Sequence, residues 1–435
     1  MAMVENDRQS IDYRRALEAL RNGVPNRHAV GVLGSNQHKI VSSFQERLSS
    51  VATSANEGKQ VRGLLISGGF GAGKSHLLDY LEHLSVEKNF VCSRVVISKE
   101  TPLFDPAKVY LAAIDGAVVP GLTGETIPEI AVRLQPNSRA YAGFFEWANS
   151  RESGLSDLFK ATILLYERLN NDPELVDQIT KFWSGERLAL IRIRQGLKQI
   201  NCSGMFALKP VKIKDLALQR FIFASRLMLA AGYSGWVLLM DEIELVGRYS
   251  LLQRGRSYAE LARWMGRVKG EVYPGLTAVA AITDDFGLAV LQEKGDRDVV
   301  GAKLRAKEKD EYNTLAGRAE TGMRLIEREA LALEPPDEST LTHTYQRLKE
   351  IHSRAYNWDP PEIPPAVISM TRRMRSYVRR WVNEWDLKRL YPGAELSTEE
   401  EHEIGPTYEP DNLLEQPSEP YKGYAGTNEN DGDQK

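Results

Sequence analysis

Residues 64–78, LLISGGFGAGKSHLL, run from a short apolar segment through a glycine-rich turn into an amphipathic segment. They fit the phosphate-binding pattern G-x-x-x-x-G-K-[ST], which occurs where a strand leads into a helix. Glycines let such a loop pass close to phosphates and adopt positive φ angles. The loop N–H groups and the helix N-terminus then form an anion site, so the stretch predicts a P-loop. Its candidate nucleotide-binding residues are Gly68, Gly69, Phe70, Gly71, Ala72, Gly73, Lys74, Ser75 and His76.

Two side chains of this loop have expected chemical roles. Lys74 is expected to reach the β- and γ-phosphates of ATP, as a catalytic cation, and the Ser75 hydroxyl to be a Mg²⁺ ligand. ATP and Mg²⁺ are therefore the predicted cofactors. The alternative is a glycine-rich turn that carries Lys-Ser by coincidence. The apolar segment before the turn and the amphipathic one after it favour the P-loop.

A second motif is WVLLMDE, residues 236–242, an apolar strand that ends in two acids. This pattern is typical of a Walker B element. Asp241 is expected to hold Mg²⁺, and Glu242 to orient and activate the attacking water as a general base. A strand followed by Asp-Glu is common by itself. Together with an upstream P-loop it indicates the second half of a nucleotide-hydrolysing site.

Two further strand ends are polar. Residues 276–285, LTAVAAITDD, read as a buried strand, and Thr283 takes the position of a sensor that touches the γ-phosphate in additional-strand ATPases, with Asp284 second. Residues 90–98 read as another strand, followed by Glu100 and Thr101. Ligands bind at the carboxyl ends of the strands in a parallel sheet, so one interpretation is that these two residues face the nucleotide. The alternative is that they are ordinary polar residues of a loop.

The alternation of strands and helices predicts an α/β protein with the parallel sheet of an AAA+-like P-loop NTPase. Residues 105–232 have helical apolar spacing almost throughout, which predicts a large helical insertion within the core. The predicted units are the N-terminal helices and P-loop half (1–104), the insertion (105–232), the Walker B and sensor half (233–336), a C-terminal helical lid (337–396) and an acidic disordered tail (397–435).

Composition supports this division and limits the protein class. Residues 397–435 carry eleven acids and two lysines, a net charge of -9. The whole chain carries -3, so residues 1–396 carry +6. The tail has too few aliphatic residues to offset the entropy of ordering, which predicts disorder. No apolar run is long enough to cross a bilayer. Cys92 and Cys202 are not in metal-ligand spacing and suit a reducing cytoplasm.

Basic residues give weaker indications. The predicted second lid helix, residues 366–390, carries a cluster that either contacts phosphate of ATP or DNA, or forms a solvated face: Arg372, Arg373, Arg375, Arg379 and Arg380. Candidate arginine fingers for a neighbouring subunit are Arg318, Arg324 and Arg328, with solvated helix residues as the alternative. A small cluster in the insertion, Lys209, Lys212 and Lys214, favours a solvated loop over a nucleic-acid contact.

Several segments together resemble the ATP-binding proteins of BREX-type bacteriophage defence islands, of the BrxD type. The segments are GVPNR from residue 23, LGSNQ from 33, GGFGAGKSHLL from 68, VVISKETPLFDPAKV from 95 and LLMDEIEL from 238. The resemblance implies an origin-recognition-like AAA+ ATPase in anti-phage defence. It further implies a cytoplasmic protein that works beside a large helicase-like partner and other BREX proteins. Because the motifs supply no certain cationic group in cis for the charge that develops on the γ-phosphate, we also expect a homo-oligomer in the ATP state. The +6 charge of the body and the arginine cluster predict binding to double-stranded or forked DNA.

Other functional classes fit less well or remain open. A GTPase would need an Asn-Lys-x-Asp segment to read guanine, and the sequence has none. A small-molecule P-loop kinase would not need Glu242 after Asp241. An ATP-gated scaffold that hydrolyses little and recruits partners to DNA fits the same motifs as an ATPase, and the sequence leaves both open.

Overall fold

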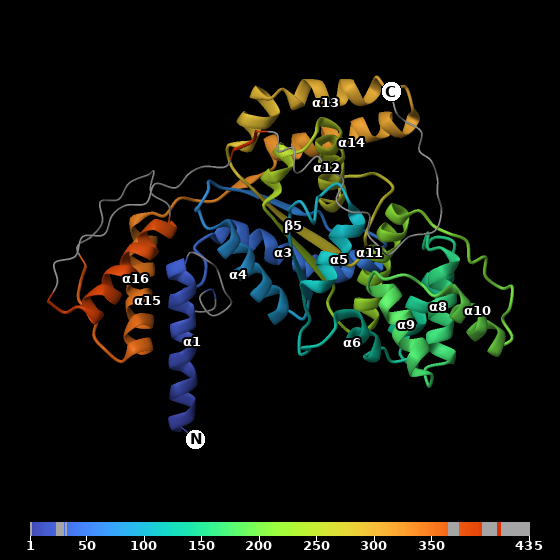
Figure 1. Ribbon diagram of the computed structural model, residues 1–435, viewed down its shortest axis with the longest axis horizontal. Helices are drawn as coiled ribbons and strands as arrows, with labels where there is room; N and C mark the ends of the chain where they lie inside the picture. The colour runs from blue at the N-terminus through green and yellow to red at the C-terminus, as the bar shows by residue number, and fades with distance from the viewer. Residues whose placement is uncertain (1, 23–29, 31–32, 364–373, 394–406, 410–435) are drawn as a thin grey trace.

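A computed structural model describes residues 2–22, 30, 33–363, 374–393 and 407–409. Within these residues six strands form one sheet at the centre of the molecule (Figure 1). The strands are β1 (Leu64–Ser67), β2 (Val91–Val96), β3 (Ala117–Val118), β4 (Trp236–Asp241), β5 (Leu276–Ile282) and β6 (Leu331–Ala332). Their order across the sheet is β3-β2-β4-β5-β1-β6.

The sheet is parallel except at one edge, where β3 runs antiparallel to β2. Because parallel strands need crossover connections, helices cover both faces, and the central strands β4 and β5 are buried and mostly apolar. The predicted α/β class with a mostly parallel sheet is confirmed. The P-loop NTPase assignment within that class stays a prediction. The sequence predicts that residues 105–232 are almost wholly helical, and the short strand β3 lies within this range.

Alternate residues of each strand enter two separate cores. On one face, Ile66, Leu239 and Val279 pack with α3 (His38–Asn56) and α4 (Lys74–Glu87). On the other face, Leu238 and Ala280 pack with α5 (Pro106–Asp115), α11 (Ile213–Ala230) and α12 (Leu251–Trp264). Burial of these apolar side chains is worth roughly 1.5–3 kcal/mol each. The sheet therefore holds the ends of β1, β4 and β5 rigidly beside one another.

A group of helices lies beyond the sheet, on the side away from α15 and α16 (Figure 1). It contains α6 (Thr126–Val132), α7 (Arg139–Asn149), α8 (Asp157–Arg168), α9 (Pro173–Ser184) and α10 (Leu190–Gln199). Local sequence explains their starts: Ser138 and Asp172 cap α7 and α9, and Pro173 occupies the first turn of α9. By contrast α5 and α11, inside the predicted insertion, pack on the sheet itself. We therefore place the insertion proper at α6 to α10.

A second group of helices follows β4 and β5 and lies at the top of the view in Figure 1. It contains the 3₁₀-helix η1 (Ile243–Arg248), α12, the π-helix η2 (Gly287–Glu293), α13 (Asp296–Arg305) and α14 (Asp310–Arg328). α13 and α14 pack together on α12 (Figure 1). A buried salt bridge from Arg254 of α12 to Asp296 of α13, 2.7 Å between Nη2 and Oδ1, joins two of them.

The C-terminal helices α15 (Glu338–Tyr356) and α16 (Met374–Leu390) form a bundle with α1 (Ala2–Asn22), as Figure 1 shows. Leu17 of α1 packs with Leu348 and Trp385, and Arg21 pairs with the nearly buried Asp386. α1 was assigned with the P-loop half, but its packing partners lie in the predicted lid. The start predicted for the second lid helix, with Arg372 and Arg373, lies outside the described residues.

The acidic tail is described only at residues 407–409. There Tyr408 packs edge-on against Phe286 and its hydroxyl contacts Thr283, and disorder of the tail stays a prediction. An aromatic ring in an otherwise acidic segment gives it enough apolar area to dock. The rest of the tail lies outside the described residues. In the part of the chain that the structure describes, no helix is both long and apolar enough to cross a membrane.

We expect Gly322→Ala in α14 to destabilise the protein. A Cβ at Gly322 would overlap the Tyr258 carbonyl of α12, so the two helices would have to separate. Overpacking of this kind costs about 1–3 kcal/mol. The matched control is Gly317→Ala in the same helix, where a Cβ meets no atom within 4 Å and alanine gains up to ~1 kcal/mol in helix propensity. Equal urea midpoints for both variants would contradict this packing.

Candidate active site

The predicted P-loop connects β1 to α4. Gly71 (φ 73°) and Gly73 (φ 100°) both adopt the left-handed region, where residues with a Cβ are strained. Gly73 is the residue before the first helical residue, Lys74, so the helix begins where the sequence predicted. Phe70, at the tip of the loop, is 46% exposed. The loop backbone thus curves around the N-terminus of α4.

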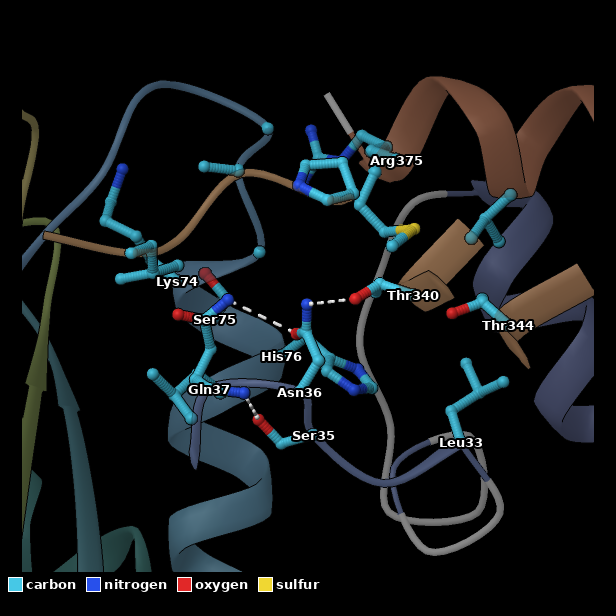
Figure 2. Close-up of a pocket in the computed structure, with 18 of the residues that line it drawn as sticks. Leu33, Ser35, Asn36, Gln37, Lys74, Ser75, His76, Thr340, Thr344 and Arg375 are labelled. Atoms are coloured by element: carbon cyan, nitrogen blue, oxygen red, sulfur yellow. Dashed lines mark hydrogen bonds between the residues drawn. The ribbon is translucent and has the colours of Figure 1, made fainter. Parts of the chain in front are cut away.

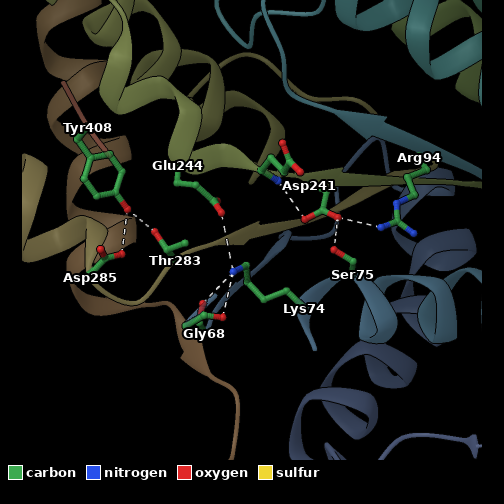
Figure 3. A network of polar contacts seen from close by, with 11 residues as sticks. Gly68, Lys74, Ser75, Arg94, Asp241, Glu244, Thr283, Asp285 and Tyr408 are labelled. Atoms are coloured by element: carbon green, nitrogen blue, oxygen red, sulfur yellow. Dashed lines mark hydrogen bonds and ion pairs between the residues drawn. The ribbon is translucent and has the colours of Figure 1, made fainter. Parts of the chain in front are cut away.

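The Lys74 amine is buried among oxygen atoms. Its Nζ donates to the carbonyl oxygens of Gly68 (2.9 Å) and Gly69 (3.4 Å), and it lies 3.8 Å from Oε1 of Glu244 (Figure 3). An ammonium with three donors needs such acceptors when it is removed from water. Lys74 therefore rests on its own loop and on an acid that follows β4.

Asp241, the last residue of β4, joins three elements through its carboxylate. Oδ2 accepts from the Ser75 hydroxyl (2.8 Å) and from Nη2 of Arg94 (2.8 Å). Oδ1 accepts from the backbone N–H of Glu242 (3.0 Å). Arg94 of β2 also pairs with Asp79 of α4. The structure thus brings together Ser75 and Asp241, the two predicted Mg²⁺ ligands, and adds a cation beside them.

Glu242 turns the chain out of β4. Its backbone is left-handed (φ 59°, ψ 37°), unusual for glutamate, and its side chain is exposed. Loss of hydration and the adjacent Asp241 carboxylate raise the pKa of Glu242, although Lys74 and Arg94 favour its charged form. The predicted general base therefore stands at the strand end next to Asp241, in a strained conformation of the kind that clusters at functional sites.

Sequence reasoning missed Glu244 and Arg94. Glu244 is 8% exposed, and among the described residues its Oε2 has no hydrogen-bond partner. Burial raises the pKa of Glu244 to about 7, even though Lys74 favours the carboxylate. The signal for Glu244 was the third acid of the Asp-Glu-Ile-Glu run. The signal for Arg94 was a charge within an otherwise apolar strand.

Thr283, directly after β5, is 2% exposed and lies at the same edge of the sheet as Asp241, since β5 is paired to β4. Its hydroxyl contacts the Tyr408 hydroxyl at 2.6 Å, and Tyr408 donates to Asp285 at 2.9 Å (Figure 3). Asp284, the second sensor candidate, is exposed. Glu100 and Thr101 instead bond to Ser98 within their own turn, as the ordinary loop interpretation predicted.

A cavity of about 570 Å³ lies between the P-loop and the bundle of α1, α15 and α16 (Figure 2). It is large enough for a nucleotide-sized ligand. Every predicted P-loop residue from Phe70 to His76 lines it, as do Asp241, Glu242 and Glu244. The lid contributes Arg375, which belongs to the predicted basic cluster, and side chains that the sequence analysis did not propose for the site: Thr340, His343, Thr344 and Met374.

The segment before α3 connects the lid to the loop. Gln37 is buried and pairs with both backbone groups of Glu334: its Nε2 donates to the carbonyl (3.0 Å), and its Oε1 accepts from the N–H (2.8 Å). Asn36 donates to Thr340 of α15 at 3.4 Å, and His76 contacts the Gly34 carbonyl at 2.9 Å. Burial lowers the pKa of His76. His76 thus contacts residues 33–38, the segment that lines one side of the cavity.

The basic residues that were candidates for phosphate contacts separate into groups. Arg375 lies over the Phe70 ring, 5.6 Å from its centre, and lines the cavity. Arg380 pairs with Glu384 of its own helix. Of the finger candidates, Arg318 pairs with Glu271, whereas Arg324 and Arg328 are exposed on α14. In the insertion, Lys214 pairs with Glu260 across 3.1 Å.

A family model described as "BREX system ATP-binding protein BrxC/D" matches residues 9–120 and 211–381. The match covers most of the chain and confirms the family that the sequence motifs resemble. It treats BrxC and BrxD together, so it does not separate the BrxD type. Residues 121–210, which contain α6 to α10, fall between its two segments. No curated protein and no solved structure matches the chain.

We expect Arg94→Met to destabilise the protein by about 3 kcal/mol, because it leaves Asp79 and Asp241 in a largely buried place without their shared cation. The double variant Arg94→Met/Asp79→Asn should recover part of the loss, since one of the two carboxylates is neutralised. Denaturant titrations measure both differences. A loss below 0.5 kcal/mol in the single variant, or no recovery in the double, contradicts the shared ion pair.

Proposed function

The chain belongs to the family of BREX system ATP-binding proteins BrxC/D, and we propose that it is a Mg²⁺-dependent ATPase of bacterial phage defence. The observation that carries this proposal is that three chain segments meet at the carboxyl ends of the parallel strands. Lys74 and Ser75 follow β1, Asp241 and Glu242 end β4, and Thr283 follows β5. In this sheet β5 separates β1 from β4, the additional-strand arrangement.

The residues present fit ATP and Mg²⁺. Two glycines with positive φ leave the loop backbone open to phosphates. Ser75 and Asp241 offer oxygen atoms 2.8 Å apart, and Mg²⁺ prefers oxygen ligands and few of them from protein. When bound, Mg²⁺ neutralises negative charge that develops on the phosphates. Leu20, Leu33 and Val378 also line the cavity and offer apolar contacts that suit a nucleobase.

The side chains then have distinct tasks. Lys74 exchanges its loop carbonyls and Glu244 for phosphate oxygens, which bear more negative charge than carbonyls. Glu242 accepts a proton from the attacking water. The Thr283 hydroxyl donates to the γ-phosphate. Arg375 of the lid supplies a cation from the same chain, and Glu244, close to Lys74, is an alternative proton acceptor.

Two further parts of the proposal concern assembly. Arg324 and Arg328 are exposed on α14, which suits an arginine that acts on a neighbouring subunit in a homo-oligomer. The body charge of +6 suits double-stranded or forked DNA beside a helicase-like BREX partner. Membership of a BREX system makes other BREX proteins the expected partners. The rival function is an ATP-gated scaffold with little hydrolysis of its own.

We expect ATP turnover to rise with protein concentration and with DNA, and DNA affinity to fall steeply between 50 and 200 mM salt, by about tenfold or more. Steady-state assays with duplex, forked and single-stranded DNA, together with light scattering in ATP and Mg²⁺, test this.

Arg324→Ala should reduce specific activity if α14 faces a neighbour, with Arg347→Ala, an exposed arginine on α15, as the control. A monomer with constant specific activity would contradict the trans arginine.

We expect Glu242→Gln to bind ATP but to hydrolyse it slower by a factor on the order of a hundred, as after loss of a general base. Lys74→Ala should instead lose binding, and with it the ATP-dependent stabilisation of about 2.7 kcal/mol at a hundredfold excess over Kd. Turnover and thermal shift measure the two effects. Glu244→Gln is the matched comparison: if it loses turnover while Glu242→Gln keeps it, the base is Glu244.

A further inference from the structure

Residues 407–409, which we call the strap, reach the active-site edge from far along the chain. Tyr408 is the residue that docks. Its hydroxyl contacts Thr283 and Asp285, and its ring meets Phe286 edge-on at 5.8 Å between centroids. Lys294 donates to the Tyr408 carbonyl (3.0 Å) and to the Gly247 carbonyl (2.8 Å). Four residues therefore contact one tyrosine, and Figure 3 shows two of these contacts, to Thr283 and Asp285.

The docking place has the shape of this ring. A Cβ at Gly247 would lie 2.8 Å from Cδ1 of Tyr408, closer than side-chain atoms approach one another. Gly247 is thus the residue that leaves room for the ring. Polar groups meet the hydroxyl and the carbonyl of Tyr408, while Phe286 supplies an apolar contact with its ring. Such complementarity distinguishes a docking site from a chance surface contact.

The hydrogen-bond directions around Tyr408 follow from proton counting. A phenol has one proton, and a carboxylate only accepts. The Tyr408 hydroxyl donates its proton to Asp285. In the 2.6 Å contact with Thr283, Tyr408 therefore accepts and Thr283 donates. The single proton of the Thr283 hydroxyl is consumed by the strap.

We propose that the strap is an inhibitory segment that competes with the γ-phosphate for the Thr283 hydroxyl. This inference rests on the proposed function, in which Thr283 donates to the γ-phosphate. While Tyr408 is docked, Thr283 has no second proton to give. Release of the strap frees the Thr283 hydroxyl to donate to the γ-phosphate. Any binding event that displaces residues 407–409 therefore raises ATP turnover.

Competition at Thr283 must act in both directions. If the docked strap lowers the affinity for ATP by some factor, bound ATP must weaken docking of the strap by the same factor. ADP has no γ-phosphate and should leave the strap in place. Docking therefore lowers affinity for ATP and not for ADP.

The first test is Tyr408→Phe, which keeps the ring and removes the oxygen that accepts from Thr283. We expect turnover, and affinity for a non-hydrolysable ATP analogue, to rise by about three- to tenfold, the range that one neutral hydrogen bond supports. ADP affinity should not change. Tyr391→Phe, at an exposed tyrosine of the full chain, is the control. In a Thr283→Val background, Tyr408→Phe should have no effect.

Hydrogen exchange of the peptide that contains residues 407–409 separates the possible failures. We expect exchange to increase with the ATP analogue and Mg²⁺, and in Tyr408→Phe, but not with ADP. Unchanged analogue affinity and unchanged exchange in Tyr408→Phe would overturn the strap even if the wild type hydrolyses ATP. Strap release by the analogue without turnover in any variant would keep the strap and overturn the ATPase function.

Discussion

The carboxylate of Asp241 is the interaction on which the site depends. It accepts hydrogen bonds from Ser75 of α4, Arg94 of β2 and the backbone of Glu242, so the P-loop helix and two strands meet at one residue. A carboxylate this far from water needs several donors. The same three donors set its orientation. Any displacement of β4 relative to α4 would break at least one of them.

Charge balance around Asp241 explains its neighbours. Asp79, Asp241, Glu242 and Glu244 are close to two cations, Lys74 and Arg94. Loss of hydration, with a smaller effect of the neighbouring acids, raises the pKa of Glu242 and raises that of Glu244 to about 7. The acids hold the Lys74 amine beside the P-loop. A left-handed Glu242 keeps its own carboxylate outside the buried network.

The two ends of the described chain contribute to the site. α1 and the last helices form the wall opposite the P-loop, and residues 407–409 meet the end of β5. The candidate site residues at the strand ends are thus faced by the helical bundle and by the strap. Segments outside the packed sheet can open locally without disturbing the strands.

The positions of the candidate site residues at the strand ends could be predicted from the sequence. Glycine spacing and apolar runs before acids depend on the local conformation of the backbone. It predicted Lys74, Ser75, Asp241, Glu242 and Thr283, which the structure brings to one edge, and a mostly parallel sheet. The side chains that hold these residues together could be found only in the folded structure. Arg94, Gln37 and Tyr408 act across long sequence separations. Such pairings follow from packing and leave no local periodicity to read.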